Sequence, residues 1–176
     1  MTLEFILIQL VGLIAWGILA VSYYREDTDK ILAFQTIAAI LYAVHYYFLG
    51  ATSGLIICTF EAFRDFAYYK TDVDKYIFYA SIPLYIAYGV LSCKIVYDIL
   101  PIFSSFLGSW SLTNRKKIIV FCAVIEYLLW IIYDLHVGSF TCAFTDAIIV
   151  FANASILLFS DKLFKDDEKL NNLFNK

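Results

Sequence analysis

The chain has 176 residues, of which 62% are apolar, 19% are aromatic and only 16% are charged, with a formal net charge of −3. A typical soluble domain has about 45–50% apolar and about 25% charged residues. Too few polar residues are therefore present to cover a water-soluble globule, which excludes a soluble enzyme domain. Intrinsic disorder is excluded as well, because it requires low hydrophobicity. The length predicts one domain.

Apolar stretches long enough to cross a bilayer, which takes about 20 residues in a helix, follow one another along the whole chain. We predict seven membrane-spanning helices, at 5–24, 31–49, 53–70, 75–92, 97–112, 117–135 and 140–159. The N-terminus, apolar from Leu3 to Val21, lacks a basic segment and carries Glu4, which predicts a retained helix rather than a cleaved signal peptide.

The basic residues predict the orientation of these helices, because Lys and Arg favour cytoplasmic loops. With the N-terminus outside, the clusters of Lys and Arg between the spans lie on the inner side; Lys94 lies outside and Arg64 lies within a span. Six or eight spans would move several of these clusters to the wrong side. We therefore predict an external N-terminus and a cytoplasmic C-terminus.

Tyrosines gather at the ends of the spans, where aromatic side chains form belts at the two membrane interfaces. The residues expected in these belts are Tyr23, Tyr24, Tyr46, Tyr47, Tyr68, Tyr69 and Tyr76.

A weak internal repeat is visible at a shift of 88 residues, which lays 41–65 over 129–153. The identical pairs are Leu41/Leu129, Gly50/Gly138 and Phe63/Phe151. Basic connections coincide, glycine-containing turns coincide, and a shift of four spans preserves the orientation of each helix. Repeats related by an axis along the membrane normal are a known transporter architecture, with the binding site between the repeats near mid-membrane.

These patterns predict an all-α membrane protein of seven transmembrane helices, with two parallel three-helix bundles joined by a linker helix (a 3+1+3 layout). Residues 1–70 form the first bundle, 75–92 the linker transmembrane helix and 97–160 the second bundle. A cytoplasmic tail follows at 161–176. Two interpretations of the tail stay open, namely an amphipathic helix on the inner membrane surface or a solvated segment.

Several stretches give the chain a resemblance to known families. They are Gln35 after a polar connection, 45–50 (HYYFLG), 100–112 (LPIFSSFLGSWSL), Gly138-Ser139 and Asn153. With its seven spans the chain looks like the SWEET and PQ-loop superfamily, and more narrowly it resembles the bacterial inner membrane YgjV family up to about residue 160. The resemblance implies a location in the bacterial inner membrane and no settled biochemical activity. The chain departs from the family at Glu61 and at Tyr133-Asp134, and it lacks the Pro-Gln dipeptide and the proline set of SWEET helices.

Ionisable side chains within spans cost on the order of a few kcal/mol each at a helix centre, so they require a partner or a water-filled cavity. By spacing, Glu61, Arg64 and Asp65 share one helix face. One interpretation is an Arg clamped between two carboxylates as a packing device; the other is an ion or proton relay, or a gate near the inner mouth. The other polar intramembrane candidates are His45, Glu126, Asp134 and Asp146.

Four side chains are candidates for binding a substrate between the two bundles. If the 88-residue correspondence holds, Tyr42 faces Trp130 and Asp65 faces Asn153. The SWEET transporters that the chain resembles hold sugars with aromatic and Asn side chains of the corresponding helices. An aromatic face covers the apolar side of a small polar molecule, while amide and carboxylate groups bind its hydroxyls.

Two further residues are candidates for a role in gating. His45 is interpreted either as a hydrogen-bonding residue of the helix interface or as a proton-linked group, since histidine titrates near physiological pH. Pro101 removes a backbone hydrogen bond and permits a kink, which makes it a candidate hinge. It precedes small-residue pairs that favour tight helix packing: Ser104/Gly108 and Ser105/Ser109.

Other kinds of site find no support in the sequence. The four cysteines lie in separate apolar segments without metal-ligand spacing, so we interpret them as packing residues and expect no metal site. No catalytic or nucleotide-binding motif occurs, which predicts no enzyme activity and no cofactor. Lys and Arg form no large basic surface, so no nucleic acid partner is expected.

Two functions follow as hypotheses. The first is a carrier of a small polar solute that works by alternating access between the two repeats. The second is a non-transporting membrane scaffold, or a protein that binds lipid or a partner. A channel ranks last, because the sequence has no ring of charge or filter-like segment. Membrane lipids are expected partners, and a homo-oligomer stays open.

Overall fold

The computed structural model describes residues 2–22, 24–25, 27–70, 74–93, 95–111 and 116–159. These residues form α-helices and one short 3-10 helix, in the following order: α1 (Leu3–Ser22), α2 (Thr28–Leu49), α3 (Thr52–Lys70), α4 (Asp74–Ser92), η1 (Val96–Asp98), α5 (Ile99–Ser111), α6 (Lys116–Val137) and α7 (Phe140–Phe159). Each predicted span corresponds to one of these helices, and the predicted ends differ from the observed ones by less than one helical turn. The all-helical class is therefore confirmed for the described residues.

Four of the helices, α1, α2, α6 and α7, are long and apolar enough to cross a membrane. The remaining helices differ for physical reasons. α3 carries several charges, among them Glu61, Arg64 and Asp65. In α4, the apolar stretch found among the described residues is Tyr76–Tyr88. α5 has 13 residues, so at 1.5 Å per residue it is about 20 Å long.

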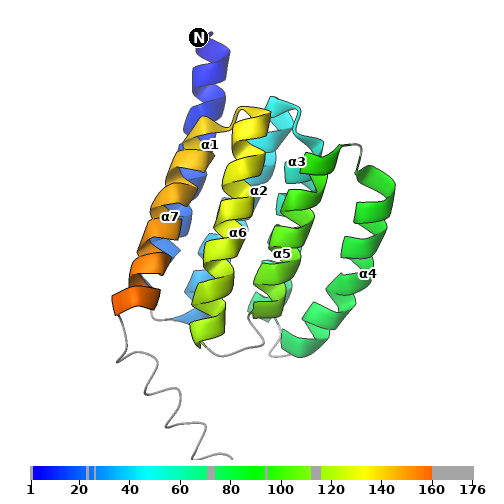
Figure 1. The fold of residues 1–176 in the computed structure, drawn as a ribbon, viewed down its shortest axis with the longest axis vertical. Helices are drawn as coiled ribbons and strands as arrows, with labels where there is room; N and C mark the ends of the chain where they lie inside the picture. The colour runs from blue at the N-terminus through cyan, green and yellow to red at the C-terminus, as the bar shows by residue number, and fades with distance from the viewer. Residues whose placement is uncertain are drawn as a thin grey trace, which may run out of the picture.

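The helices stand in two rows, as Figure 1 shows. In the first row α2 packs between α1 and α3, and in the second row α6 packs between α5 and α7. The rows meet at both edges, where α1 packs on α7 and α3 packs on α5. α4 stands outside the two rows and contacts α5 and α3.

The N-terminal end of α1 and the C-terminal end of α7 lie at opposite ends of the bundle (Figure 1). One end holds the turns between α2 and α3 and between α6 and α7, and we call it the glycine end after Gly50 and Gly138. The opposite end holds Arg25, Lys30, Lys70 and Lys117, and we call it the basic end. The described basic residues outside the bundle interior thus gather at one end.

The two turns at the glycine end have the same backbone. Gly50 and Gly138 adopt φ angles of 69° and 80°, in the left-handed region that glycine enters without strain. The N–H of Ala51 donates to the carbonyl of Tyr46 at 2.9 Å, and the N–H of Ser139 donates to that of Asp134 at 2.8 Å. This is the six-to-one hydrogen bond of a Schellman motif. The two turns, 88 residues apart, therefore share one backbone geometry. In the sequence, this correspondence is marked by the identical glycine alone.

The outer surface of the bundle is largely apolar, and the interior holds polar side chains beside an apolar core cluster. Exposed apolar side chains lie along most helices; Phe63 and Phe151, which are identical in the repeat, are 71% and 76% exposed. Fully buried polar side chains include His45 and Asp134. Apolar side chains on the surface and polar side chains in the interior fit a protein whose surface meets lipid.

The structure corrects one of the residues expected in the aromatic belts. Tyr24, Tyr47 and Tyr76 are exposed, but Tyr46 is buried in the core. Its neighbour Tyr47 points outward because consecutive helical residues lie about 100° apart around the axis, so only one of the two can face the interior.

The structure also corrects the predicted effect of Pro101 on the backbone. Pro101 is the third residue of α5 and is buried. The N–H groups of the first helical turn have no partner within the helix, so a proline there removes no intrahelical hydrogen bond. The proline inside a helix is Pro83 in α4.

Some predicted features lie outside the described residues. They are the tail at 161–176, Tyr23, Lys94 and the connections 71–73 and 112–115.

Candidate functional site

His45 joins three helices at the glycine end. Its Nδ1 lies 2.8 Å from the carbonyl oxygen of Ile8 in α1, and its Nε2 lies 2.8 Å from Oγ of Ser139, beside α7. A carbonyl oxygen only accepts, so Nδ1 carries the hydrogen and Nε2 of the neutral ring accepts from the serine hydroxyl. The structure thus gives His45 the hydrogen-bonding role that was one of its two interpretations.

Tyr133 makes the matching contact in the opposite direction. It lies 88 residues after His45, and its hydroxyl accepts a 2.7 Å hydrogen bond from the N–H of Gly54 in the first turns of α3. His45 therefore reaches from the first row to the α6–α7 turn, and Tyr133 reaches from the second row to the start of α3. His45 and Tyr133 thus both reach across the rows, although their partners, Ser139 and Gly54, do not occupy equivalent positions.

Tyr46 and Asp134, also 88 residues apart, bond directly to one another. The hydroxyl of Tyr46 donates to Oδ1 of Asp134 at 2.7 Å, and the ring of Tyr46 stacks on Trp130 with centroids 5.7 Å apart and an interplanar angle of 19°. Gly54 permits this packing, because a Cβ there would lie 2.7 Å from the Tyr46 ring. Oδ2 of Asp134 is buried and makes no hydrogen bond within the described part of the chain. Tyr46 and Asp134, which occupy equivalent positions in the two halves of the chain, thus meet at the centre of the interface between the rows.

Both edges of the interface are closed by polar pairs at the glycine end. Between α1 and α7, the side-chain amide of Gln9 donates to the carbonyl of Gly138 and accepts from the N–H of Thr141, each at 2.9 Å. At the other edge, the hydroxyl of Ser53 in α3 donates to Asp98 of η1. Thr141 lies 88 residues after Ser53, so the two edges are closed from equivalent positions.

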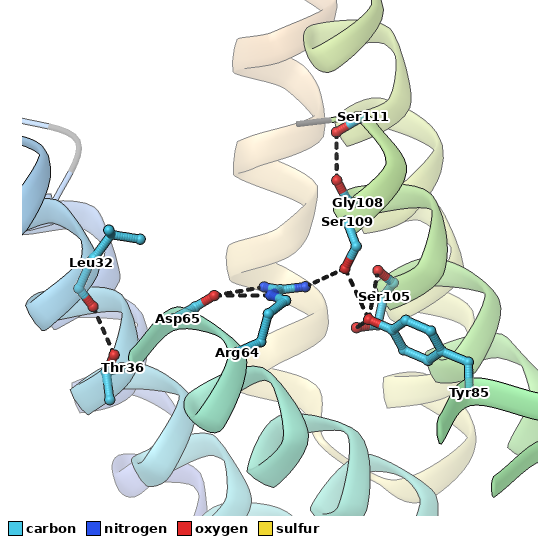
Figure 2. Close-up of polar contacts among 9 residues, drawn as sticks. All are labelled: Leu32, Thr36, Arg64, Asp65, Tyr85, Ser105, Gly108, Ser109 and Ser111. Atoms are coloured by element: carbon cyan, nitrogen blue, oxygen red, sulfur yellow. Dashed lines mark hydrogen bonds and ion pairs between the residues drawn. The ribbon is translucent and has the colours of Figure 1, made fainter. Parts of the chain in front are cut away.

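A charged cluster occupies the half of the interior nearer the basic end, and Figure 2 shows its centre. Arg64 in α3 donates from Nε and Nη2 to Oδ1 of Asp65, at 3.0 and 2.9 Å, and from Nη1 to Oγ of Ser109 in α5 at 2.7 Å. The hydroxyl of Tyr85 in α4 lies 2.9 Å from Oγ of Ser109. Arg64 therefore ties α3 to α5, and α4 joins the same network.

The predicted clamp of Arg64 between two carboxylates is corrected in one respect. Asp65 is one partner, but the hydroxyl of Ser109 takes the second place. Glu61 lies within electrostatic range of Arg64 and Asp65 and close to Ser105. A helix turn separates Glu61 from Arg64, and the long guanidinium extends toward α5 instead.

Glu126 joins this cluster from α6. A Cβ added to Gly108 in α5 would lie 2.6 Å from Oε2 of Glu126, so the carboxyl sits directly against the α5 backbone. Glu126 interacts electrostatically with Glu61 and Arg64 across the interface. Together with the fully buried Ser104, Ser105 and Ser109, this supports the interpretation of the α5 small-residue pairs as sites of close helix packing.

The four candidate substrate-binding residues lie in different surroundings. Trp130 is buried against Tyr46, and Tyr42 packs at the margin of the same core cluster. Asp65 is engaged by Arg64. The amide of Asn153 donates to the carbonyl of Ile149 in its own helix at 3.0 Å. These contacts do not gather the four residues around one cavity. The ring that stacks on Trp130 is that of Tyr46.

Two cavities open on the flanks of the bundle. One of about 460 Å³ lies on the outer face between α2 and α3, lined by apolar and small residues that include Ile40, Ala43, Ala62 and Phe66. Another of about 720 Å³ lies at the glycine end beside α1 and α7 and is lined by Gln9 and Thr141. None of the candidate substrate-binding residues lines either cavity.

The cysteines pack in the helices, with Cys58, Cys122 and Cys142 buried and Cys93 half-buried. Among the described residues, no group of three or more His, Cys, Asp or Glu side chains is arranged to hold a metal ion.

Sequence reasoning assigned no contact across the bundle to several residues of these networks: Gln9, Ser53, Tyr85, Ser109, Tyr133 and Ser139. A polar side chain in an apolar span was the available signal for Gln9. For Tyr46 and Tyr133 no such signal exists, because a tyrosine near a span end fits an interfacial belt equally well.

Comparison with known proteins places the chain in a family. A family model described as a bacterial inner membrane protein, Imp-YgjV, matches residues 6–159. No curated protein and no solved structure shows significant similarity to the chain. The match covers nearly all of the described helices, and it agrees with their apolar surfaces. The chain belongs to the Imp-YgjV family of bacterial inner membrane proteins.

Proposed function

We propose that the protein is a carrier of a small polar solute that works by alternating access between two three-helix units, α1–α3 and α5–α7, joined by α4. This is the 3+1+3 layout of SWEET-like proteins, and its two units correspond to the two rows of Figure 1. The absence of a nucleotide-binding motif from the sequence favours passive or ion-coupled transport.

The observation that carries the proposal is the equivalence of contacts between the units. Exchange of α1–α3 with α5–α7 turns the α1–α7 contact into the α5–α3 contact. It also carries His45 onto Tyr133, each of which contacts the opposite unit near the start of its third helix, and it carries Tyr46 onto its own partner, Asp134. Two units related by an axis along the membrane normal can rock against one another in alternating access.

The composition of the interface supports a polar solute. Tyr46, Trp130 and Tyr133 provide aromatic faces, with centroids 5.7–5.9 Å apart. Asp134 and the charged cluster of α3 provide hydrogen-bonding groups at two depths. When the units separate, an aromatic face with carboxyl and hydroxyl groups above and below suits a small molecule with several hydroxyl or amino groups.

The basic end supports an orientation with the N-terminus outside and the C-terminus in the cytoplasm. Arg25, Lys30, Lys70 and Lys117 lie at that end, and positive residues favour the cytoplasmic side. Reporter fusions at Asn114 and His136 should report opposite sides of the membrane; the same side for both would contradict this orientation.

Uptake into proteoliposomes tests the carrier function. A panel of sugars, vitamins and amino acids is offered to the purified, reconstituted protein, and uptake of at least one class above empty liposomes is expected. Arg64→Met serves as a comparison, because loss of the α3–α5 tie should change uptake. A flat panel with correctly folded protein would count against a carrier.

A second candidate function is a sealed scaffold that binds lipid or a partner. The observation that favours it is the apolar cavity of about 460 Å³ between α2 and α3, whose lining suits an apolar occupant such as an acyl chain. The closed hydrogen bonds of His45, Tyr46 and Arg64 agree with it as well.

Cysteine labelling distinguishes the two functions. In a background without the four native cysteines, Trp130→Cys and Asn153→Cys are exposed to a water-soluble thiol reagent. Labelling indicates a wetted interface and favours the carrier, whereas protection favours the sealed scaffold. Tyr24→Cys, at a position that is exposed near a helix end, is the positive control, and the lipid-facing Phe151→Cys is the negative control.

A further inference from the structure

Carboxyl groups follow one another through the depth of the bundle. Counted along the helices from Gly138, Asp134 lies about 6 Å, Asp146 about 12 Å and Glu126 about 18 Å below the glycine end, at 1.5 Å per residue. Counted from Gly50 in the same way, Glu61 lies at about 16 Å and Asp65 at about 22 Å. Successive groups are thus separated in depth by no more than about 6 Å.

These groups, which we call the carboxyl ladder, also interact laterally. Asp146 interacts electrostatically with Asp134 on one side and with Glu126 on the other. Glu126 interacts in turn with Glu61 and Asp65 across the interface between the rows. The ladder therefore involves α6, α7 and α3, and it includes carboxyl groups of both proposed units.

The ladder has too little positive charge to be ionised throughout. Among the described residues, Arg64 is the basic side chain that lies within it, and that guanidinium is already engaged by Asp65 and Ser109. His45 offers no compensating charge while Nε2 accepts from Ser139. A set of five carboxylates with one Arg would hold a charge of about −4 at a depth where each unpaired charge costs a few kcal/mol.

A second, independent feature marks the upper end of the ladder. Asp134 is fully buried, one oxygen accepts from Tyr46, and the other oxygen makes no hydrogen bond with the described residues. A proton on that oxygen would remove the charge and supply a donor toward the ladder. No group of three or more metal-ligating side chains surrounds any rung within the described residues, which favours a proton over a metal cation.

Several other titratable side chains face the ladder from the packed helices. They are Tyr42, His45 and Tyr46 from α2; Cys58 and Arg64 from α3; Tyr85 from α4; Cys122 and Tyr133 from α6; and Cys142 from α7. α5 contributes the hydroxyls of Ser105 and Ser109 instead. Hydroxyl groups bridge carboxyls in proton relays without adding charge.

We propose that the carboxyl ladder from Asp134 through Asp146 and Glu126 to Glu61 binds protons and conducts them between the glycine end and the charged cluster. In this role it couples solute movement to the proton gradient. The coupling rests on the proposed carrier function; the proton binding does not. Chains of Asp and Glu within spans are a known device of proton-driven transporters.

Infrared spectroscopy of the full chain in lipid tests proton binding directly, with the proton as the only probe. A carbonyl absorption of protonated carboxyl groups is expected at neutral pH and is lost on alkaline titration. Asp134→Asn, Asp146→Asn, Glu126→Gln and Glu61→Gln should each lower it, whereas Asp29→Asn, at an exposed position in the first turn of α2, should leave it unchanged.

Two results would overturn the inference. One is a wild-type spectrum without protonated carboxyl absorption at neutral pH, which needs no variant to fold. The other is loss of the absorption on addition of Na⁺ at constant pH, which would assign the ladder to a metal cation. The outcome is separable from the carrier test: a flat uptake panel with the absorption present contradicts the carrier alone, and uptake without the absorption contradicts the ladder alone.

Discussion

The two ends of the bundle differ in how well the halves of the chain match. At the glycine end, α2 and α6 finish in the same Schellman turn, and the equivalent residues His45 and Tyr133 each reach across to the opposite row. Toward the basic end, Glu61 and Arg64 in α3 correspond to Ile149 and Ala152 in α7. Backbone geometry is shared where the turns define it, whereas the ion pair of Arg64 and Asp65 has no counterpart at Ala152 and Asn153.

The difference teaches where the two halves have become specialised. A turn that needs a left-handed glycine and a capping hydrogen bond tolerates little change, because its requirements lie in the backbone. A buried ion pair has no such backbone requirement. It can therefore occur in one half of the chain and still serve the interior that both rows share. Four changes test this contrast.

The largest effect is expected for Arg64→Met. The side chains of Arg64 and Asp65 are 13% and 10% exposed, and removal of one partner of a buried pair leaves an uncompensated charge. The free energy of unfolding in mixed micelles should fall by about 3–5 kcal/mol. A loss below about 1 kcal/mol would mean that water reaches the cluster, and the contrast between the two ends would break.

Tyr46→Phe removes one hydroxyl from the centre of the interface. Because the hydroxyl donates to the buried Asp134, its loss should lower the free energy of unfolding by about 1–3 kcal/mol. The matched control is Tyr47→Phe, whose side chain is 65% exposed and should give no measurable change. Equal behaviour of the two variants would contradict the central Tyr46–Asp134 contact.

Gly50→Ala and Gly138→Ala sharpen the equivalence of the two turns. A Cβ at either position meets no atom within 4 Å, so the cost arises from the left-handed backbone alone. It should be similar for both, at about 1–2 kcal/mol in the free energy of unfolding.

Gly17→Ala controls for the loss of glycine itself. Gly17 also has free space around it, but it lies inside α1, so alanine there should stabilise the protein by about 0.5–1 kcal/mol. A large difference between the Gly50 and Gly138 variants would show that the turns are not equivalent.

The smallest effect is expected for Lys30→Met. Lys30 and Asp27 form an ion pair at 3.4 Å, but their side chains are 65% and 51% exposed. Such a pair is screened by water and contributes about 0–1 kcal/mol. Stability measured at low and high salt should hardly differ between this variant and the wild type, in contrast to the variant of Arg64.

Several features were predictable because they depend on local pattern. Apolar stretches placed every helix to within a turn, since a span must satisfy its backbone hydrogen bonds internally. Gly50 and Gly138 marked both turns.

The site was less predictable because partners depend on how helices cross. Spacing placed Glu61 and Asp65 on one face with Arg64, yet the guanidinium bonds to Ser109 in another helix. The shift of 88 residues paired Tyr42 with Trp130, whereas the ring that stacks on Trp130 is that of Tyr46, one turn away. Periodicity defines a face to within a turn, and a stacking contact requires a finer register than that.

The sequence by itself determined that lipid surrounds this protein, where its helices begin and end, and that polar groups face inward, because these follow from hydropathy and from the backbone of each helix taken alone. Only the tertiary structure decided that Tyr46 is buried and that the equivalent residues Tyr46 and Asp134 bond to one another at the centre. Those features arise from contacts between helices far apart in the chain, and a one-dimensional pattern does not encode the rotation and depth at which two helices meet.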